Sequence, residues 1–470
     1  MRYLIVLLAI SILYSCTPDD SLEVPTSLES RNFVWKGLNL YYLWQTDVPD
    51  LSDNRFASQQ ELNAYLNNFS SPESLFQQLR TDAQTDRFSV IYSDYRVLQQ
   101  VLSGTNDSNG MDFGLRFVPG SQTAIFGWVR YVLPGSDAAA KNVRRGDIFY
   151  AINGTPLTVS NYLDLLSLPS YTIELASFQN GILTPTGESV LLIKQPFAEN
   201  PVHLSTVIQQ GNKTIGYLMY NGFLAGWESQ LNNAISSLKA AGINELVLDL
   251  RYNSGGSIAT ATRLASMITG QFAGQVFARE QWNSKAQAYF SSQGGENLID
   301  RFTTQLGNGT PLTSLNLTRV FVLTTRSTAS ASELLINGLA PYIDVVQIGE
   351  ATNGKNVGSI TLYDSPDFRF ENRNTSHRYA MQPIVLRIAN SANFGEYTQG
   401  LPADILQAEN LENLGTLGNP QEPLLQTALQ VIGGNGRLQN ISPTTEHFSD
   451  SKAVLGQNRM FRDLPPNDFN

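Results

Sequence analysis

The chain has 470 residues, of which 42% are hydrophobic and 10% aromatic, enough for sizeable buried cores in about three domains. Its formal net charge of -10 argues against nucleic acid or an anionic membrane surface as the main partner. A single cysteine excludes an intrachain disulfide and a metal site built from several cysteines. No motif calls for a metal ion or a cofactor, so we expect neither.

The N-terminus has the pattern of an export signal. Residues 1–13 combine one positive side chain with an apolar run that is too short to span a bilayer. The run ends at Leu13-Tyr14-Ser15-Cys16, which resembles a bacterial lipoprotein signal whose cysteine becomes lipidated. We therefore expect a signal peptide over 1–16, lipidation at Cys16, a polar tether over 17–30, and a lipid anchor in the bacterial cell envelope. On this reading the anchor lies in the outer membrane, with the protein on the periplasmic side or at the cell surface. The alternative for Cys16 is a buried free thiol.

Residues 31–105 carry apolar and aromatic side chains at helical spacing, among them Phe33, Trp35 and Tyr41. This periodicity is typical of helices that pack one face on a core. The segment therefore predicts a small N-terminal helical domain.

Residues 106–196 predict short strands around one short helix, and they resemble a PDZ domain. In that family a strand edge pairs with the backbone of a peptide and a nearby loop binds its terminal carboxylate. The resemblance implies that Phe113, Gly114 and Leu115 bind substrate. The alternative is that these three residues form a bulged strand of the domain core.

Residues 200–433 alternate strands with helices, which predicts an α/β domain with a mainly parallel sheet. Two strand-to-helix turns stand out, one at 249–257 after the strand 245–251 and one at Ser330 after the strand 320–323. Parallel strands end at the same sheet edge, so we expect the two turns to meet. The polar tail over 434–470 is expected to lack regular structure.

Ser330 lies where a strand turns into a helix, and Lys355 follows the next strand. A serine hydroxyl needs a base, and a desolvated, neutral lysine can supply it. The chain has three histidines, all outside recognisable motifs, which argues against a serine-histidine-aspartate triad. The alternative is structural, because Ser330-x-x-Glu333 is also a capping-box signature and a lone lysine is usually solvated.

Three motifs together resemble the S41 family of C-terminal processing serine peptidases. They are Asp249-Leu250-Arg251-x-Asn253-x-Gly255-Gly256, Ser330-Ala331-Ser332-Glu333 and Gly354-Lys355. The resemblance covers residues 31–430 and implies a ClpP/crotonase-like α/β fold for the catalytic domain. It implies Ser330 as nucleophile and Lys355 as general base.

The same resemblance implies an oxyanion hole formed by the backbone N–H groups of Ala331 and of Gly255 or Gly256. Ser359 stands where many members of the family have a glutamine that orients the lysine. A phosphate-binding loop is the other reading of the paired glycines, but no Gly-Lys-Ser/Thr follows them.

The resemblance implies a serine endopeptidase that cleaves polypeptides near free C-termini, with the PDZ-like domain assisting binding. Because Ser359 departs from the family pattern, a membrane-tethered peptide-binding protein with weak or no catalysis is the alternative. A carbohydrate enzyme with paired carboxylates is a third class, but no acidic pair stands out in the sequence.

Overall fold

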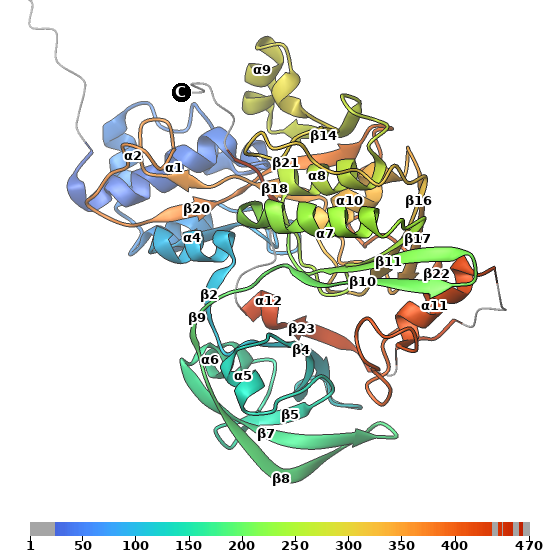
Figure 1. Cartoon of the computed structure of the whole chain (residues 1–470). Coiled ribbons are helices and arrows are strands. Elements are labelled where there is room, and N and C mark those ends of the chain that lie inside the picture. The colour runs from blue at the N-terminus through green and yellow to red at the C-terminus, as the bar shows by residue number, and fades with distance from the viewer. Residues whose placement is uncertain (1–23, 435–439, 444, 455–459, 464–470) are drawn as a thin grey trace, which may run out of the picture.

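The computed structural model describes residues 24–434, 440–443, 445–454 and 460–463. The expected signal peptide, Cys16 and the first part of the tether lie outside these ranges. Figure 1 shows N-terminal helices at the upper left, an α/β region at the upper right and a β-rich domain below them. None of the helices in the described ranges is long and apolar enough to cross a membrane.

The N-terminal region contains four α-helices, α1 (Glu29–Tyr41), α2 (Gln59–Leu66), α3 (Pro72–Gln78) and α4 (Tyr95–Ser103). The hydroxyls of Ser58 and Ser71 cap α2 and α3 by accepting backbone N–H groups of the first turn. Strand β1 (Val90–Tyr92) pairs with β20 (Ala380–Gln382), which also pairs with β19 (Leu362–Tyr363). The buried apolar side chains of α1–α3 form one continuous cluster with those of the α/β region. The predicted helices are present, but they share a core with the catalytic domain.

The β-rich domain has its own core. Strand β2 (Thr105–Ser108) pairs with β9 (Gln195–Ala198) where the chain enters and leaves the domain. The sheet runs in the order β23-β3-β4-β5-β7-β8, with β6 paired to β5. Its elements are β3 (Met111–Phe117), β4 (Ile125–Val132), α5 (Asp137–Ala140), β5 (Ile148–Ile152), β6 (Thr155–Pro156), α6 (Tyr162–Ser167), β7 (Ser170–Gln179) and β8 (Ile182–Ile193).

The first sheet of the α/β region has the order β10-β11-β12-β16-β17-β22. Only the β10–β11 pair is antiparallel, so the sheet is mainly parallel, as predicted. Its strands are β10 (Val202–Gln210), β11 (Lys213–Tyr220), β12 (Glu245–Asp249), β16 (Arg319–Thr324), β17 (Asp344–Gly349) and β22 (Ile405–Leu406). Helix α7 (Glu228–Ala240) packs on β10, and α11 (Pro423–Ile432) packs on β12, β16 and β17.

A second sheet, which the sequence did not predict, has the order β13-β24-β18-β21-β14-β15. Its strands are β13 (Gly256–Ser257), β14 (Val276–Trp282), β15 (Ile299–Arg301), β18 (Val357–Ser359), β21 (Ile384–Asn390) and β24 (Met460–Phe461). Helix α8 (Ile258–Thr269) packs on α10 (Ala331–Leu339), which contacts β17 of the first sheet and β14 and β21 of the second. Helix α9 (Ser284–Ser292) packs on β14 and α1.

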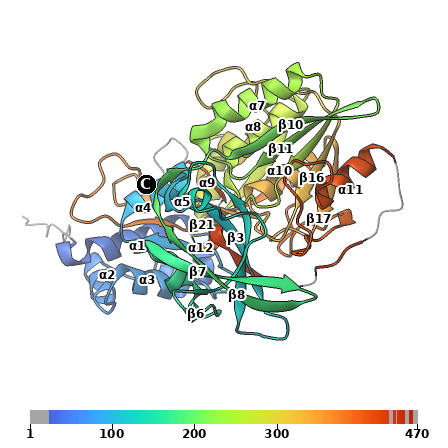
Figure 2. The ribbon, with the colours of Figure 1, turned by 60° about the horizontal axis from the view of Figure 1, so that its bottom comes forward.

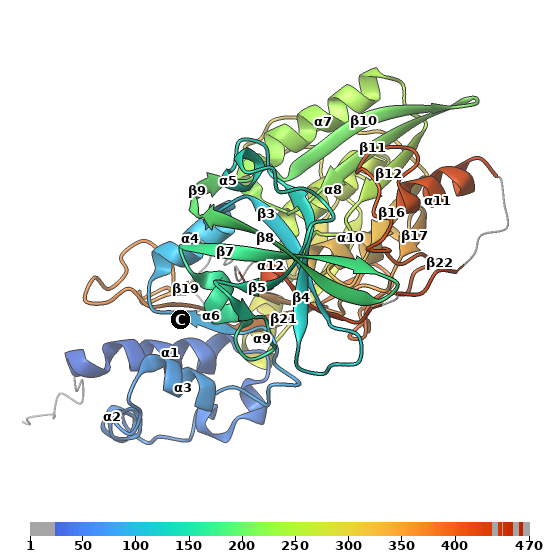
Figure 3. The ribbon, with the colours of Figure 1, turned by 90° about the horizontal axis from the view of Figure 1, so that it is seen from below.

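The polar tail was expected to lack regular structure, and this is wrong for its described residues. They form β23 (His447–Asp450), α12 (Ser451–Val454) and β24. Strand β23 pairs with β3 and β24 lies between β13 and β18. Figure 1 places α12 between the β-rich domain and the α/β region, Figure 2 shows it beside β3, and Figure 3, seen from below, shows the β-rich domain in front of it. The prediction failed because the polar residues Asp450, Ser451 and Lys452 are buried against polar partners, so polar composition did not indicate missing structure here.

Candidate active site

The two predicted turns meet at the carboxyl edge of the parallel sheet. Strands β12 and β16 are parallel neighbours, so the chain leaves both at the same edge. The backbone oxygen of Asn253 accepts the Ala329 N–H at 3.1 Å and the Ser332 hydroxyl at 3.0 Å. These bonds fasten the glycine-containing turn to the turn that carries Ser330.

Ser330 has a strained backbone, with φ of 67° and ψ of -118°. A non-glycine residue in such a conformation costs on the order of 1–3 kcal/mol and persists only where its surroundings fix it. Its N–H donates to Glu333 Oε2 at 2.7 Å. Its hydroxyl is buried and makes no hydrogen bond to any residue that the structure describes. Glu333 thus accepts the Ser330 N–H as in a capping box, while the hydroxyl makes no hydrogen bond to the helix, and the buried, strained turn is held in place by Glu333.

Glu333 joins the Ser330 turn to the Lys355 segment. The oxygen that accepts the Ser330 N–H also accepts the Lys355 N–H at 2.9 Å. The other oxygen accepts the Gly354 N–H at 2.7 Å and the Thr352 hydroxyl. Burial raises the pKa of Glu333, and these four hydrogen bonds oppose that rise by stabilising the carboxylate. The sequence analysis assigned Glu333 only a capping role. In the structure the Glu333 carboxylate binds the backbone N–H groups of both candidate catalytic residues and fixes their relative position.

The Lys355 side chain is only 2% exposed. Its Nζ lies 4.4 Å from the ring centroid of Phe88, a cation–π arrangement. The Ser330 hydroxyl has no hydrogen-bond partner in the described part of the chain, so the predicted hydrogen bond between this hydroxyl and the Lys355 amine is not formed. The backbones of Ser330 and Lys355 are brought together by Glu333 without a hydrogen bond between the two reactive groups. Phe88 lies in the N-terminal region, and no sequence signal linked it to the site.

Gly255 and Gly256 adopt φ values of 112° and 136°. The N–H of Gly255 already donates to Asn253 Oδ1 at 2.9 Å. A Cβ on Gly256 would lie 2.3 Å from the backbone oxygen of Phe223, so no other residue fits there. Ala331 is the first residue of α10, where an N–H has no partner within the helix. This geometry favours Gly256 over Gly255 as the partner of Ala331 in an oxyanion hole.

Ser359 is buried at the end of β18. Its hydroxyl donates to the Met460 backbone oxygen at 3.2 Å, and its backbone oxygen accepts the Arg462 N–H at 3.1 Å. Both contacts are with the C-terminal tail. A role of Ser359 in orienting Lys355 stays a prediction.

Phe113, Gly114 and Leu115 lie in β3, which bulges between Asp112 and Phe113 opposite β4. Phe113 and Leu115 are 5% and 0% exposed and belong to the core of the β-rich domain. A Cβ on Gly114 would lie 2.4 Å from the indole nitrogen of Trp128. These side chains match the alternative of a bulged core strand, while the backbone edge of β3 pairs with β23.

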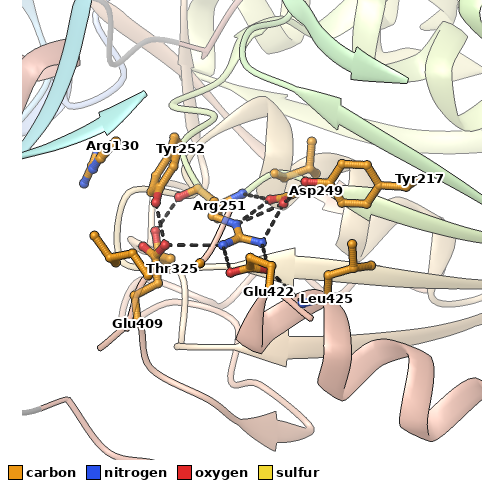
Figure 4. Close-up of polar contacts among 12 residues, drawn as sticks. Arg130, Tyr217, Asp249, Arg251, Tyr252, Thr325, Glu409, Glu422 and Leu425 are labelled. Atoms are coloured by element: carbon orange, nitrogen blue, oxygen red, sulfur yellow. Dashed lines mark hydrogen bonds and ion pairs between the residues drawn. The ribbon is translucent and has the colours of Figure 1, made fainter. Parts of the chain in front are cut away.

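Arg251 of the first motif lies in a buried charge network (Figure 4). Its guanidinium contacts the carboxylates of Asp249 at 2.8 Å, Glu422 at 2.7 Å and Glu409 at 3.3 Å. Arg145 of the β-rich domain reaches Glu409 at 2.9 Å. Burial alone would raise the pKa of Glu409, but the two arginines lower it to about 2. Arg251 therefore fixes the turn after β12 and links it to the β-rich domain. No sequence motif pointed to Glu409 or Glu422, which follow Arg251 by more than 150 residues.

Two family descriptions match this chain. Residues 214–370 match peptidase family S41, and residues 29–90 match the peptidase S41 N-terminal domain. The carboxyl-terminal-processing protease of Picosynechococcus is 28% identical over 238 residues, which cover 50% of this chain and 52% of that protein. Chloroplastic carboxyl-terminal-processing peptidase 1 of Arabidopsis thaliana is 24% identical over 332 residues, which cover 70% of this chain and 60% of that protein. The matched part is thus less than two thirds of either relative.

Among solved structures, a candidate S41 protease from Bacteroides fragilis is similar to this chain. Its TM-score is 0.65 at 26% sequence identity, over 86% of this chain and 98% of that one. The family matches, the relatives and this structure all show similarity to S41 peptidases, and the structural match supports the S41 peptidase fold.

Proposed function

We propose that this chain, as an S41-family peptidase, is a serine endopeptidase that cleaves polypeptides near their C-termini through Ser330 and Lys355. The observation that carries the proposal is the Glu333 carboxylate, which accepts the N–H groups of both residues on one oxygen, at 2.7 and 2.9 Å. The strained backbone of Ser330 and its unpartnered hydroxyl support a nucleophile rather than a cap. The C-terminal specificity rests on the names of the relatives.

In the proposed reaction the Ser330 hydroxyl attacks a peptide carbonyl while neutral Lys355 takes its proton. The N–H groups of Ala331 and Gly256 stabilise the negative charge on the carbonyl oxygen. Lys355 then gives the proton to the departing amine and later activates the water that hydrolyses the acyl-enzyme. The reaction requires a hydrogen bond from the Ser330 hydroxyl to Nζ, which the structure does not contain, and Glu333 already fixes the backbones of both residues.

The β-rich domain contributes to the proposal as a PDZ-like module that binds the substrate polypeptide. Its strand β3 offers a backbone edge of the kind that peptides pair with, although the described tail occupies it here. Lipidation of Cys16 and a place in the bacterial cell envelope remain predictions from the sequence.

The direct test compares Ser330→Ala with Ser237→Ala, which removes an exposed hydroxyl on α7. Both variants are incubated with a disordered protein, and the fragments are identified by mass spectrometry. Ser330→Ala should lower kcat/KM by roughly 1000-fold or more, as for other serine nucleophiles, and Ser237→Ala should change it little. Undiminished cleavage by Ser330→Ala would disprove the assignment.

A second candidate function is a peptide-binding protein with weak or no catalysis. It is favoured by one observation, that the Ser330 hydroxyl makes no hydrogen bond to the Lys355 amine. Such a protein would bind a polypeptide tail and release it uncut. Intact substrate after prolonged incubation with an equimolar amount of protein would support this function over the first.

A further inference from the structure

The described C-terminal residues 445–454 and 460–463, here named the strap, pair with strands at two places. One is the edge of β3 in the β-rich domain, and the other is the gap between β13 and β18 beside the candidate oxyanion glycine. Figure 1 shows α12 of the strap between the β-rich domain and the α/β region. The strap therefore contacts both the predicted peptide-binding edge and a strand beside the candidate active site.

At the first surface the strap adds a strand to β3. Ser449 pairs with Leu115 and Asp450 with Gly114, in antiparallel register. Phe448 packs its ring on Phe117, with centroids 5.2 Å apart. This backbone pairing with an apolar anchor is the way in which an extended peptide is recognised at a sheet edge.

Polar contacts hold the next part of the strap. Asp450 lies 3.5 Å from Arg130, and the Ser451 hydroxyl donates to Asp112 at 2.7 Å. Lys452 forms an ion pair at 3.1 Å with Glu199, which follows the β-rich domain. All three strap residues are buried. Buried charges are costly without partners, so this surface is suited to a polypeptide that presents an acid, a hydroxyl and a base in succession.

At the second surface the strap lies on the candidate oxyanion hole. Met460 pairs with Gly256, and Ser359 of β18 bonds to the Met460 backbone. Phe461 lines a pocket of about 40 Å³ together with Gly255 and Gly256. The ion pair between Arg462 and Glu280 fastens the end of β24. A substrate strand cannot pair with the edges of β13 and β18 while β24 occupies them, because each edge offers one set of backbone groups.

We propose that the strap is an intramolecular occupant of the polypeptide-binding surface and keeps the peptidase inactive until it is displaced. This inference rests on the proposed function. A tethered segment acts at an effective concentration on the order of millimolar, so it outcompetes a free substrate of ordinary affinity. The Ser330 hydroxyl makes no hydrogen bond to Lys355, which accords with a resting enzyme whose binding surface is filled.

The test removes the strap after the protein has folded. A recognition site for a specific protease is inserted after Gly434, which is exposed, and the cut protein is separated from its C-terminal fragment. The matched control carries the same site after Gly211, at the exposed tip of the β10–β11 hairpin. Cleavage after Gly434 should raise kcat/KM on a disordered protein at least tenfold, and the control cut should change it little.

A synthetic peptide of residues 440–470 should then restore inhibition by raising KM without lowering kcat, and a scrambled peptide should not inhibit. Unchanged or lower activity after strap removal would overturn the inference, as would equal inhibition by the scrambled peptide. A full-length variant, Phe448→Ser, gives a second test that needs no cleavage, because it loosens β23 and should raise activity several-fold.

The two proposals fail in different ways. If Ser330→Ala abolishes activity and strap removal changes nothing, the inference is wrong and the proposed function stands. If no cleavage is found at all, the proposed function is wrong. Binding of the labelled 440–470 peptide to the strap-free Ser330→Ala protein then still tests whether the strap occupies the binding surface. Absence of that binding would overturn the inference.

Discussion

The Ser330 turn and the strap lie close to the same glycines but are held in different ways. The turn is fixed by a buried carboxylate, by bonds to Asn253 and by strands that are central in their sheet. The strap is held by strands of two to four residues and by ion pairs to side chains of the β-rich domain and the second sheet. The turn keeps a strained geometry within one sheet, whereas the strap bridges the β-rich domain and the second sheet, where Met460 of β24 is buried in the main core. The proposed release of the strap must therefore detach β24 from between β13 and β18.

Gly256→Ala should have the largest effect on the fixed region. The new Cβ would meet the Phe223 backbone oxygen at 2.3 Å, and alanine disfavours a φ of 136°. We expect unfolding free energy to fall by about 2–4 kcal/mol and activity to fall by roughly 1000-fold, since the candidate oxyanion N–H moves. Chemical denaturation and peptide cleavage measure both effects. Gly211→Ala is the control, because nothing lies within 4 Å of its Cβ; equal losses in both variants would contradict the account.

Glu333→Gln tests whether one carboxylate keeps the two catalytic segments in register. The amide keeps the shape but loses the charge, and its NH2 group would face backbone donors. Activity should fall by about 100-fold, with a loss of about 2–3 kcal/mol in unfolding free energy. Glu412→Gln, an exposed carboxylate, is the control. A stable Glu333→Gln enzyme with full activity would show that the clamp is dispensable.

The strap, in contrast, should respond to pH through His447. Burial lowers the pKa of His447 to about 4 in the docked strap, with Arg130, Arg116 and Arg326 also lowering it and Asp450 opposing them. A released strap has the ordinary value of about 6.5. At a pH between these two pKa values, His447 binds a proton in the released strap but not in the docked strap. The affinity of docking is therefore unaffected above pH 7 and weakens as the pH falls below 6.5.

The 440–470 peptide should therefore bind the strap-free protein about tenfold more weakly at pH 5.5 than at pH 7.5. Fluorescence anisotropy with a labelled peptide measures the affinity. The affinity of a peptide carrying His447→Gln should not show this pH dependence. This control is needed because burial raises the pKa of Asp112 to about 6, so Asp112 could titrate in the same pH range. An identical pH dependence for both peptides would rule out His447 as the cause.

Arg462→Ala should have the smallest effect. It removes the ion pair to Glu280 at the end of β24 and leaves the anchors at β23 in place. Partly buried pairs of this kind contribute on the order of 1 kcal/mol, so activity should rise by about fivefold at most. Steady-state cleavage of a disordered substrate measures the change. A fall in activity would indicate that β24 supports the active site rather than blocks it.

The sequence predicted the parts of this fold that have strong local signals. The predicted strand 245–251 covers β12, and the apolar run at 320–323 lies within β16. A helix was predicted directly after Ser330, and α10 begins at Ala331. The meeting of the two turns followed from the parallel order of β12 and β16. These elements are long, buried and regularly spaced, so their pattern is visible without tertiary information.

The rest depended on contacts between distant segments. Strands β13, β18 and β24 have two or three residues, too few to show a period. The strap was judged by its polar composition, although Asp450 and Lys452 are buried against Arg130 and Glu199. Phe88 approaches Lys355 from the N-terminal region, across more than 260 residues of chain. Such pairings are set by the fold and have no local signature.

The central claim is that Ser330 is an activated nucleophile that the strap holds at rest. It is tested most directly by the rate at which a serine-directed covalent probe labels the intact and the strap-free protein, with the labelled residue located by mass spectrometry. The account predicts labelling at Ser330 that is at least tenfold faster without the strap. A strap-free protein that leaves Ser330 unlabelled would contradict it.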